Sequence, residues 1–333
     1  MHQGQIQQRS TRMRSKAGAR QVEAAWRMSW ARDEVGITDH ANTPTLAGFG
    51  QRFFEYLPDR VSAGTLRFYT DAWSPLIAFV PMATAKLHRI DPGLIQQFIE
   101  WRRAQDVKPA TVNGSLRTLR HALHLAKEWK LINTVPKITM LPGERMREFI
   151  ISEELLSKFM EQCSPSMRRL LPFLIDTGLR ISEACALTWN TVSLEPMAGA
   201  VRGWVYVTKG KSRYAKRYVP LTDRAHSILE VLQKLSECEY VFTTHDYKRK
   251  MTRDYPSAQF RAIRNRLELP WDAVMHSCRH TFCSRLGESG CDAFTIQKLA
   301  GHSSIVISQR YVHPTPERLE NAITRMQAVR INV

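Results

Sequence analysis

Hydrophobic side chains recur every three or four residues between positions 43 and 133, which is the spacing of one buried helix face. Thr43-Pro44 predicts the start of a first helix, and Asp91-Pro92 predicts a capped start with proline in the first turn. Further helices are expected from about residues 62 and 109. Four helices over this length predict a small helical bundle.

A stretch rich in proline, glycine and basic residues follows the bundle, at 134–149. Proline and glycine interrupt regular structure, so this stretch is expected to be a linker. Ser152, followed by two acidic residues, then predicts the N-cap of a new helix. We therefore expect a helical domain over residues 41–133 and a second domain over residues 150–333.

The second domain departs from helical spacing in one region. Residues 203–208 and 217–221 predict two strands joined by a turn at 209–212, and residues 240–243 predict a third strand. The rest reads as helical, including an amphipathic helix from about Pro316. The expected fold class is mainly α with a small antiparallel β-sheet (α+β).

Charge is the feature of the composition that changes this picture. The 333 residues include 48 Lys and Arg against 31 Asp and Glu, a formal net charge of +17. Such an excess attracts polyanions, so double-stranded DNA is the expected partner. A basic protein that is indifferent to nucleic acid remains the alternative at this point.

Basic side chains gather in the later half of the predicted bundle, in the predicted turn and again after residue 248. Such residues are commonly a solvated face, but in a strongly basic chain they are also candidates for phosphate contacts. The candidate DNA-binding residues are Arg102, Arg103, Lys108, Arg117, Arg120, Lys211, Arg249, Lys250 and Arg253.

The first 40 residues form a separate basic segment, with five Lys or Arg from Arg9 to Arg20 and no acidic residue before Glu23. A disordered arm that lies along DNA phosphates and a plain solvated tail both fit this pattern. The sequence does not decide between them.

The chain has no apolar run long enough to span a bilayer, and its basic N-terminus lacks the apolar stretch of a secretory signal. The six cysteines form no C-x-x-C pair and are expected to be reduced thiols. These features are typical of a cytoplasmic protein, which for a DNA-binding chain means association with the nucleoid.

One cluster raises the question of zinc, because His276, Cys278, His280 and Cys283 lie within eight residues. On a helix, positions 278 and 283 point in different directions, and the usual paired ligand spacing is missing. There is also no glycine-rich phosphate loop and no carboxylate cluster. We expect neither a metal nor a cofactor.

Two stretches could hold a phosphate and protonate its leaving group. Gly178 is expected to end an apolar helix, which places Arg180 at the mouth of the next one, where its guanidinium could grip two phosphate oxygens. Glu183, one turn later, could hold that guanidinium in place. Lys209, in the turn between the two strands, could give a proton to a departing oxygen.

Two further stretches add a base and a nucleophile. His276 and Arg279 are three residues apart and share a helix face, which suits a proton acceptor beside a phosphate clamp. His302 follows a glycine at a helix end, and Tyr311 comes nine residues later. Taken singly, each of these residues is more often a surface or packing residue.

The order of these residues carries more information than any one of them. Arg, Lys, His-x-x-Arg, Gly-His and Tyr, from Arg180 to Tyr311, resemble the signature of the tyrosine site-specific recombinases, the phage integrase family. The resemblance covers about 150–315, while the preceding bundle resembles the family's core-binding domain only in size and helix count. Ala300 stands where the family generally has a larger aliphatic residue, at a position that packs rather than reacts.

The resemblance implies that duplex DNA is cut and rejoined through a 3′-phosphotyrosyl link, without ATP. It assigns Tyr311 as nucleophile, and Arg180, Arg279 and His302 as phosphate ligands. It assigns His276 as proton acceptor or orienting group and Lys209 as general acid.

The resemblance also implies monomers in solution that assemble as a homotetramer on DNA. The helix from Pro316 would then dock on a neighbouring protomer, or alternatively pack on its own domain. Whether the tyrosine cuts in its own subunit's site or in a partner's is left open, as is the target sequence.

Other functions share parts of this pattern. A type IB topoisomerase uses the same Arg, Lys, His and Tyr set, and a catalytically inactive DNA-binding protein could keep the scaffold. A basic helical adaptor that binds RNA or protein is a third class, although no aromatic-rich strand motif of the RNA-binding kind is present.

Overall fold

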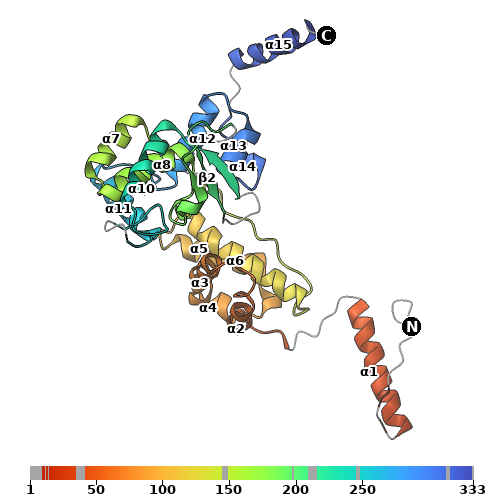
Figure 1. Ribbon diagram of the computed structural model, residues 1–333. Coiled ribbons are helices and arrows are strands. Elements are labelled where there is room, and N and C mark those ends of the chain that lie inside the picture. The colour runs from red at the N-terminus through yellow and green to blue at the C-terminus, as the bar shows by residue number, and fades with distance from the viewer. Residues whose placement is uncertain are drawn as a thin grey trace. The chain divides into compact units, whose positions relative to one another are not determined.

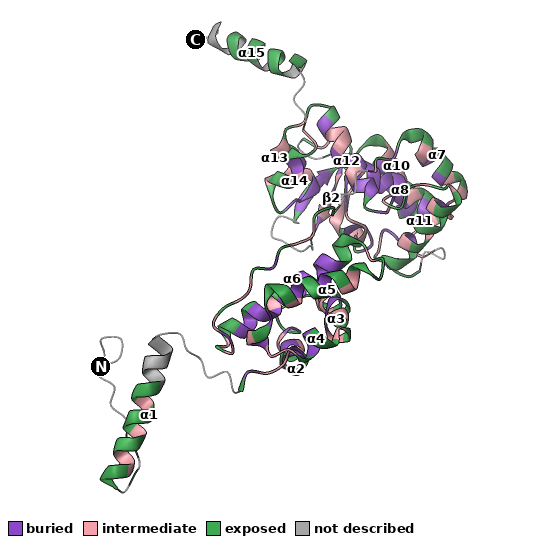
Figure 2. Cartoon of the chain, turned by 180° about the vertical axis from the view of Figure 1, so that it is seen from behind, coloured by how far each residue is buried: buried purple, intermediate pink, exposed green. Residues whose placement is uncertain are grey.

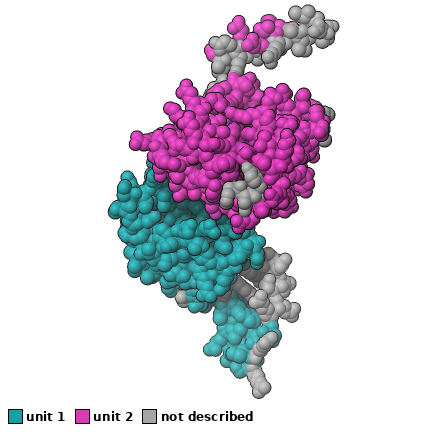
Figure 3. Space-filling view, turned by 60° about the vertical axis from the view of Figure 1, so that its left-hand side comes forward, with its two compact units in different colours: residues 1–145 teal, residues 146–333 magenta. Residues whose placement is uncertain are grey.

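The computed structural model describes residues 10–11, 13, 15–34, 42–144, 149–196, 199–208, 216–244, 248–312 and 316–331. The chain divides into two compact units, residues 1–145 and 146–333, coloured teal and magenta in Figure 3. The described residues are mostly helical, with one three-stranded antiparallel sheet in the second unit (Figure 1). The expected fold class is confirmed. No described helix is both long and apolar enough to cross a membrane.

The first unit is built from helices whose starts follow from local capping. The side chains of Thr45, Ser62 and Asp91 each accept a hydrogen bond from a backbone N–H of the first helical turn. The elements are α1 (Lys16–Glu34), α2 (Leu46–Tyr56), α3 (Ala63–Ala78), α4 (Val80–Thr84), the 3-10 helix η2 (Leu87–Arg89), α5 (Pro92–Arg103) and α6 (Pro109–Glu128).

The first unit differs from the sequence prediction in two places. Where four helices were expected, the chain breaks at Phe79 and starts the extra short helix α4, because Pro81 in its first turn cannot donate a backbone hydrogen bond. In the basic N-terminal segment, Lys16–Glu34 forms helix α1, for which the sequence offered only an arm or a tail.

Helix α6 packs against α3 and α5, and parts of its ribbon are buried, purple in Figure 2. Its apolar stripe is fully buried and consists of Val112, Leu116, Leu119, Leu123 and Ala126. Asn113, also fully buried, fastens the chain that leaves the bundle. Its side-chain amide donates to the carbonyl of Leu141 (2.9 Å), and its side-chain oxygen accepts from the Leu141 N–H (2.7 Å). Ile138 is buried nearby, so this part of the predicted linker packs on the bundle.

The second unit places helices on both sides of its sheet: α7, α8, α10 and α11 on one side and α13 and α14 on the other (Figure 1). The helices are α7 (Glu153–Gln162), α8 (Pro165–Thr177), α9 (Ile181–Ala184), the 3-10 helix η3 (Trp189–Thr191), α10 (Asp223–Leu235), α11 (Asp254–Arg266), α12 (Ser277–Glu288), α13 (Ala293–Ala300), α14 (Ile305–Gln309) and α15 (Pro316–Ile331). Ser152 caps α7 as predicted, accepting from the Leu155 N–H.

The sheet has the order β1 (Val192–Ser193), β2 (Trp204–Val207) and β3 (Arg217–Pro220). β2 and β3 confirm the two predicted strands, and they alternate between buried and outward-facing side chains. The prediction of a third strand at 240–243 is wrong, because only Tyr240 and Thr243 take part in β-pairing there, each in an isolated bridge. Val241 and Phe242 are both buried, and consecutive burial gave a strand-like pattern without a ladder.

Candidate active site

The end of helix α8 sets the position of Arg180, the first site residue along the chain. Gly178 ends this helix with a left-handed backbone (φ +62), and a Cβ at this position would lie 2.2 Å from the ring of Phe282. Both the backbone and the close approach require glycine. The tight turn places Arg180 at the N-cap of α9, as the sequence predicted.

A single buried carboxylate joins two guanidinium groups. Glu183 Oε1 accepts from Arg180 Nη1 (2.7 Å), and its Oε2 accepts from Arg217 Nη2 (3.0 Å). The Glu183 side chain is 3% exposed. Burial raises the pKa of this carboxyl, but the hydrogen bonds and charges of Arg217 and Arg180 outweigh that effect and leave the pKa below its ordinary value. Glu183 is therefore a charged anchor for both arginines.

Arg217 is a member of the site that the sequence interpretation missed. It lies on β3 with only 5% of its surface exposed, and its Nε donates to the carbonyl of Leu299 (2.6 Å) at the end of α13. Arg180 Nη2 donates to the carbonyl of Gly301 (3.1 Å), two residues further on. The signal available in the sequence was a charged residue at an inward-facing position of an alternating strand.

Arg279 lies on α12 and is almost completely buried, with 3% of its surface exposed. Its Nη1 donates to the carbonyl of Gly178 (2.8 Å), whereas its Nη2 is buried and has no hydrogen-bond partner among the described residues. Burial and the nearby charge of Arg180 lower its pKa to about 10, so it is charged at neutral pH. An unpartnered buried donor on a cation is costly unless an anion reaches it.

His302 follows the left-handed cap Gly301 of helix α13 and is 5% exposed. Its Nδ1 lies 2.8 Å from the hydroxyl of Ser308. Burial and nearby positive charge lower the pKa of this imidazole to about 3, which keeps it neutral at physiological pH. The charges that act on it belong to Arg279, Arg180, His276 and Arg217. These four cationic or ionisable groups come from three elements, α9, α12 and β3, and lie near one imidazole.

Tyr311 lies two residues after the end of α14 and packs against this cluster. Its ring is stacked near that of His302, with centroids 6.3 Å apart and planes 13° apart. Its hydroxyl lies 2.6 Å from Nδ1 of His280. Burial and the nearby Cys283 raise the pKa of the phenol to about 12, against the opposing charges of Arg279 and Arg310.

The backbone of Tyr311 also depends on helix α12. A Cβ at Gly287 would lie 1.8 Å from the carbonyl oxygen of Tyr311, so only glycine lets the chain pass here. The apolar contacts of Tyr311 are with a small buried cluster that includes Phe282, Ile296 and Ala300. Ala300, the residue at which the sequence departs from the family pattern, thus packs beneath the site and is fully buried.

The two histidines of α12 differ in their contacts with Tyr311. His276, expected as proton acceptor or orienting group, is exposed at the N-cap of α12, and its ring meets that of His280 edge-on with centroids 5.2 Å apart. His280, considered in the sequence only as a zinc ligand, is the residue that contacts the phenol of Tyr311. Its position next to Arg279 was the available signal.

The described residues contain no group of three His, Cys, Asp or Glu side chains arranged to hold a metal ion. Within the sequence cluster that suggested zinc, Cys278 and Cys283 are fully buried and His276 is exposed. Their side chains therefore do not converge on one point.

Lys209 and Lys211 lie outside the described residues, so their predicted roles remain predictions. Among the other candidates for DNA contact, Arg102 is half-buried beside the ring of Trp101, and Arg117 forms an ion pair with Glu144. The exposed candidates are Arg103, Lys108, Arg120, Arg249, Lys250 and Arg253.

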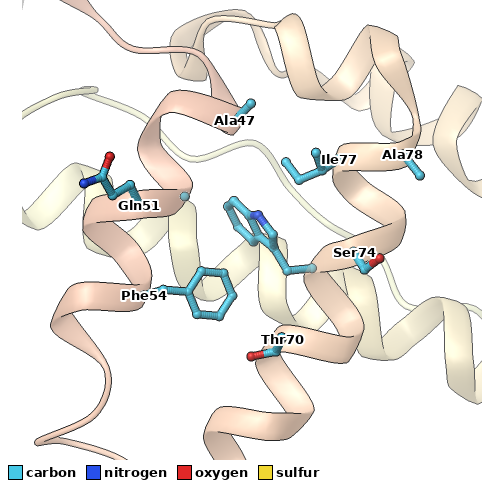
Figure 4. A pocket seen from close by; sticks show the side chains of 9 residues that line it. Ala47, Gln51, Phe54, Thr70, Ser74, Ile77 and Ala78 are labelled. Carbon is cyan, nitrogen blue, oxygen red and sulfur yellow. The ribbon is translucent and has the colours of Figure 1, made fainter.

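A pocket of about 610 Å³ lies between α2 and α3 in the first unit (Figure 4). Its walls include Phe54, Trp73 and Ile77, and no charged side chain lines it. Because phosphate recognition needs cationic or N–H donors, this pocket does not have the chemistry of the cluster around Arg279.

Comparison with known proteins identifies both units. Residues 150–318 match the phage integrase family, and residues 45–140 match the phage integrase SAM-like domain. The integrase of Escherichia phage 186 is 24% identical over 235 residues, which cover 68% of this chain and 63% of that protein. Tyrosine recombinase XerC of Bacillus subtilis is 28% identical over 228 residues, which cover 63% of this chain and 72% of that protein.

The match to transposase B from transposon Tn554 of Staphylococcus aureus covers 89% of this chain and 51% of that protein, at 23% identity. The chain thus spans between half and two thirds of the length of several of its curated relatives.

Solved structures show the same fold. The Tn1549 transposon integrase in complex with transposon right end DNA superposes with a TM-score of 0.70 at 17% identity, over 85% of this chain and 100% of that one. A lambda integrase tetramer bound to a Holliday junction superposes with a TM-score of 0.67 at 19% identity. The match covers 82% of this chain and 78% of that one. Because the family match spans half of the chain, this protein belongs to the phage integrase family.

Proposed function

We propose that this protein is a site-specific DNA recombinase that breaks and rejoins duplex DNA through a 3′-phosphotyrosyl intermediate. The observation that carries the proposal is the buried Arg279, whose Nη2 has no partner among the described residues. Its charge and that of Arg180 act on His302, against which Tyr311 stacks. A phosphodiester that enters this cluster would meet two guanidinium groups beside one phenol.

The proposed chemistry is an attack by Tyr311 Oη on the scissile phosphorus, which displaces the 5′ oxygen of the next nucleotide. Negative charge grows on the non-bridging oxygens, and Arg180 and Arg279 would stabilise it as fixed donors. The contacts with Glu183 and Gly178 hold these groups before DNA binds, so little reorganisation is needed.

His302 would add a neutral hydrogen bond to the same phosphate. Its low pKa keeps the imidazole uncharged, so one ring nitrogen carries a proton and the other does not. If Ser308 donates to Nδ1, the Nε2–H remains as a donor. Lys209 is proposed as the general acid for the 5′ oxygen, a role that rests on the family resemblance.

We propose that Tyr311 cuts DNA bound to its own subunit. Its phenol lies within hydrogen-bond distance of His280 and beside His302, both from the same unit of the same chain. Cleavage in this arrangement needs no exchange of the segment that carries the tyrosine.

DNA binding and assembly are proposed on wider grounds. The net charge of +17 and the exposed basic residues of both units would contact phosphates and make binding sensitive to salt. One structural neighbour is a lambda integrase tetramer bound to a Holliday junction, and we propose a homotetramer on DNA here as well. Helix α15 exposes Leu319, Ile323 and Met326 at helical spacing, which suits docking on a neighbouring protomer.

The proposal is tested with duplexes that carry candidate inverted repeats from the DNA flanking the coding sequence, nicked so that the cleaved end diffuses away. The native chain is expected to form a covalent protein–DNA adduct, and Tyr311→Phe to form none, while Tyr255→Phe, at an exposed tyrosine on α11, forms it normally. Arg279→Ala should lower the adduct about 10²-fold or more with a much smaller loss of binding. DNA binding without any adduct from the native chain would instead indicate an inactive scaffold.

A relaxation assay separates the remaining alternative. A recombinase joins ends from two duplexes that carry the same site, whereas a type IB topoisomerase relaxes supercoils without regard to a partner duplex. Strand exchange between two labelled sites is the expected outcome, and relaxation of unrelated plasmid alone would contradict it.

A further inference from the structure

His280 is the side chain that contacts the reacting oxygen of the proposed nucleophile. Its Nδ1 lies 2.6 Å from Tyr311 Oη, which is within the range required of a proton acceptor. We propose that His280 takes the phenol proton as Tyr311 attacks the phosphate and returns it when the strands rejoin. The inference rests on the proposed function and gives that function a named base.

The phenol needs such an acceptor. Burial and Cys283 raise the pKa of Tyr311 to about 12, so almost none of it is ionised at neutral pH. A neutral phenol is a weak nucleophile unless its proton leaves as the new bond forms. The two nearby cations that oppose this shift, Arg279 and Arg310, do not bring the pKa back to its ordinary value.

The neighbouring histidines are less suited to this role. His302 lies alongside the tyrosine ring, its Nδ1 is occupied by Ser308, and its pKa of about 3 makes it a poor base. The ring of His276 meets the ring of His280 and is exposed at the end of α12. Among the described imidazoles, only that of His280 lies within hydrogen-bond distance of the phenol oxygen.

Helix α12 fixes the geometry of this pair at both ends. Arg279 and His280 are consecutive on it, so the phosphate clamp and the base are placed by the same turn. About two turns later, Gly287 lets the backbone of Tyr311 rest on the same helix. The ionisable groups around the pair are His276, Arg279 and Cys283 on α12, Arg310 beside the tyrosine and His302 after α13.

The proton balance of the step is simple. With His280 protonated on Nε2, its Nδ1 accepts the phenol proton as the Oη–P bond forms and the P–O5′ bond breaks. The 5′ oxygen takes a proton from the general acid, for which Lys209 is proposed. The products are a 3′-phosphotyrosine, a 5′ hydroxyl and a His280 imidazolium. Rejoining runs the same transfers in reverse.

The test is the rate of adduct formation in a single turnover on the nicked substrate, measured from pH 7 to 9. His280→Asn can keep a hydrogen bond to the phenol but cannot take its proton at these pH values. We expect its rate to be about 10²-fold or more below that of the native chain at pH 7. The rate should then rise about tenfold per pH unit, because the phenolate must form by loss of a proton to solvent.

Two controls define the comparison. The native chain should show a nearly flat rate over this range, and so should His226→Asn, which changes a histidine on α10 outside the site. His276→Asn is expected to leave the slope flat even if it lowers the rate. Equal DNA affinity for His280→Asn and the native chain would show that the variant is folded and binds.

A substrate with a 5′-bridging sulfur identifies the side of the reaction on which His280 acts. A thiolate leaves without a general acid, so His280→Asn should stay slow on this substrate. Recovery of the native rate would place His280 at the leaving group and overturn the inference. A native rate with a flat pH profile for His280→Asn, or a loss of DNA affinity that accounts for the slower reaction, would overturn it as well.

The inference and the proposed function fail in different ways. If the native chain forms no adduct that depends on Tyr311, the recombinase proposal fails whatever His280 does. If that adduct forms and His280→Asn makes it as the native chain does, only the assignment of the base fails.

Discussion

Glu183 shows how single residues hold the site together. Its two carboxylate oxygens bind Arg180 and Arg217 separately, and it also accepts the backbone N–H of Arg180. A buried ion pair of this kind contributes little net stability compared with apolar packing, but removing one partner leaves the other charge buried without compensation. The carboxylate therefore fixes position more than it stabilises the fold.

Glu183→Gln is expected to destabilise the second unit by about 3 kcal/mol, because Arg217 loses its charged partner in the interior. For a unit of this size the melting temperature should fall by roughly 6 to 12 °C, measured by scanning calorimetry. The matched change Glu154→Gln, at an exposed residue of α7, should shift it by less than about 2 °C.

The ion pair between Glu183 and Arg217 also predicts how the stability of the second unit depends on pH. The pKa of Glu183 is lowered in the folded chain, so its stabilising contribution is present above the ordinary value of 4.5 and is lost as pH falls through the lower folded pKa. The difference in melting temperature between native chain and Glu183→Gln should shrink on acidification. A difference that stays constant to pH 3 would contradict the ion-pair account.

At the scale of elements, α12 is the part of the fold on which the site depends most. It carries Arg279 and His280 near its start and Gly287 near its end, and it packs beside α8, whose end carries Gly178. Arg279 donates to the Gly178 carbonyl, so the ends of two helices are tied at the point where Arg180 begins. One helix thus positions both the proposed phosphate ligand Arg279 and the backbone of the proposed nucleophile Tyr311.

Gly287→Ala tests this arrangement. A methyl group there would lie 1.8 Å from the Tyr311 carbonyl, so the segment after α14 must move and the phenol must leave its place. We expect adduct formation to fall about 10²-fold or more, since small displacements of reacting groups are costly. DNA affinity should be unchanged.

The matched control is Gly114→Ala in helix α6, where the added carbon would meet the Phe68 ring at 3.5 Å, an ordinary contact. This variant should keep the native cleavage rate. If Gly287→Ala also cleaves at the native rate, Tyr311 does not need the position described here.

Sequence pattern predicted the elements whose signals are local. Each of these signals lies within about 20 consecutive residues. They are the apolar stripe of α6, the Ser152 cap of α7 and the alternating burial of β2 and β3. The two-residue strand β1 offered no periodicity, and the false strand at 240–243 came from consecutive burial. Short elements defined by their partners leave too little pattern to detect.

The site residues also differ in whether the sequence alone could identify them. Residues that fit a known order, from Arg180 to Tyr311, could be named from the sequence, and the described ones do gather in the second unit. Arg217 and His280 could not, because their roles arise from contacts across 34 and 31 residues of chain. A sequence motif shows which residue types recur. The roles of Arg217 and His280 instead depend on their contacts with Glu183 and Tyr311, which only the folded chain brings together.

At the scale of the whole molecule, two units of different character share one strongly basic chain. The first is a helical bundle with an aromatic core, in which Phe53 stacks on Trp73 with ring centroids 5.2 Å apart. The second holds the candidate site. Both present exposed Lys and Arg, and the net charge of +17 makes DNA binding the shared property expected of them.

The proposed function depends on one covalent bond, between Tyr311 and the 3′ phosphate of a cleaved strand. The most direct measurement is to trap the adduct on nicked DNA, digest the DNA and the protein, and locate the attached nucleotide by mass spectrometry. We expect a 3′-linked nucleotide on the tryptic peptide that contains Tyr311, and a free 5′ hydroxyl on the released strand. Attachment to any other residue, or a link through a 5′ phosphate, would contradict it.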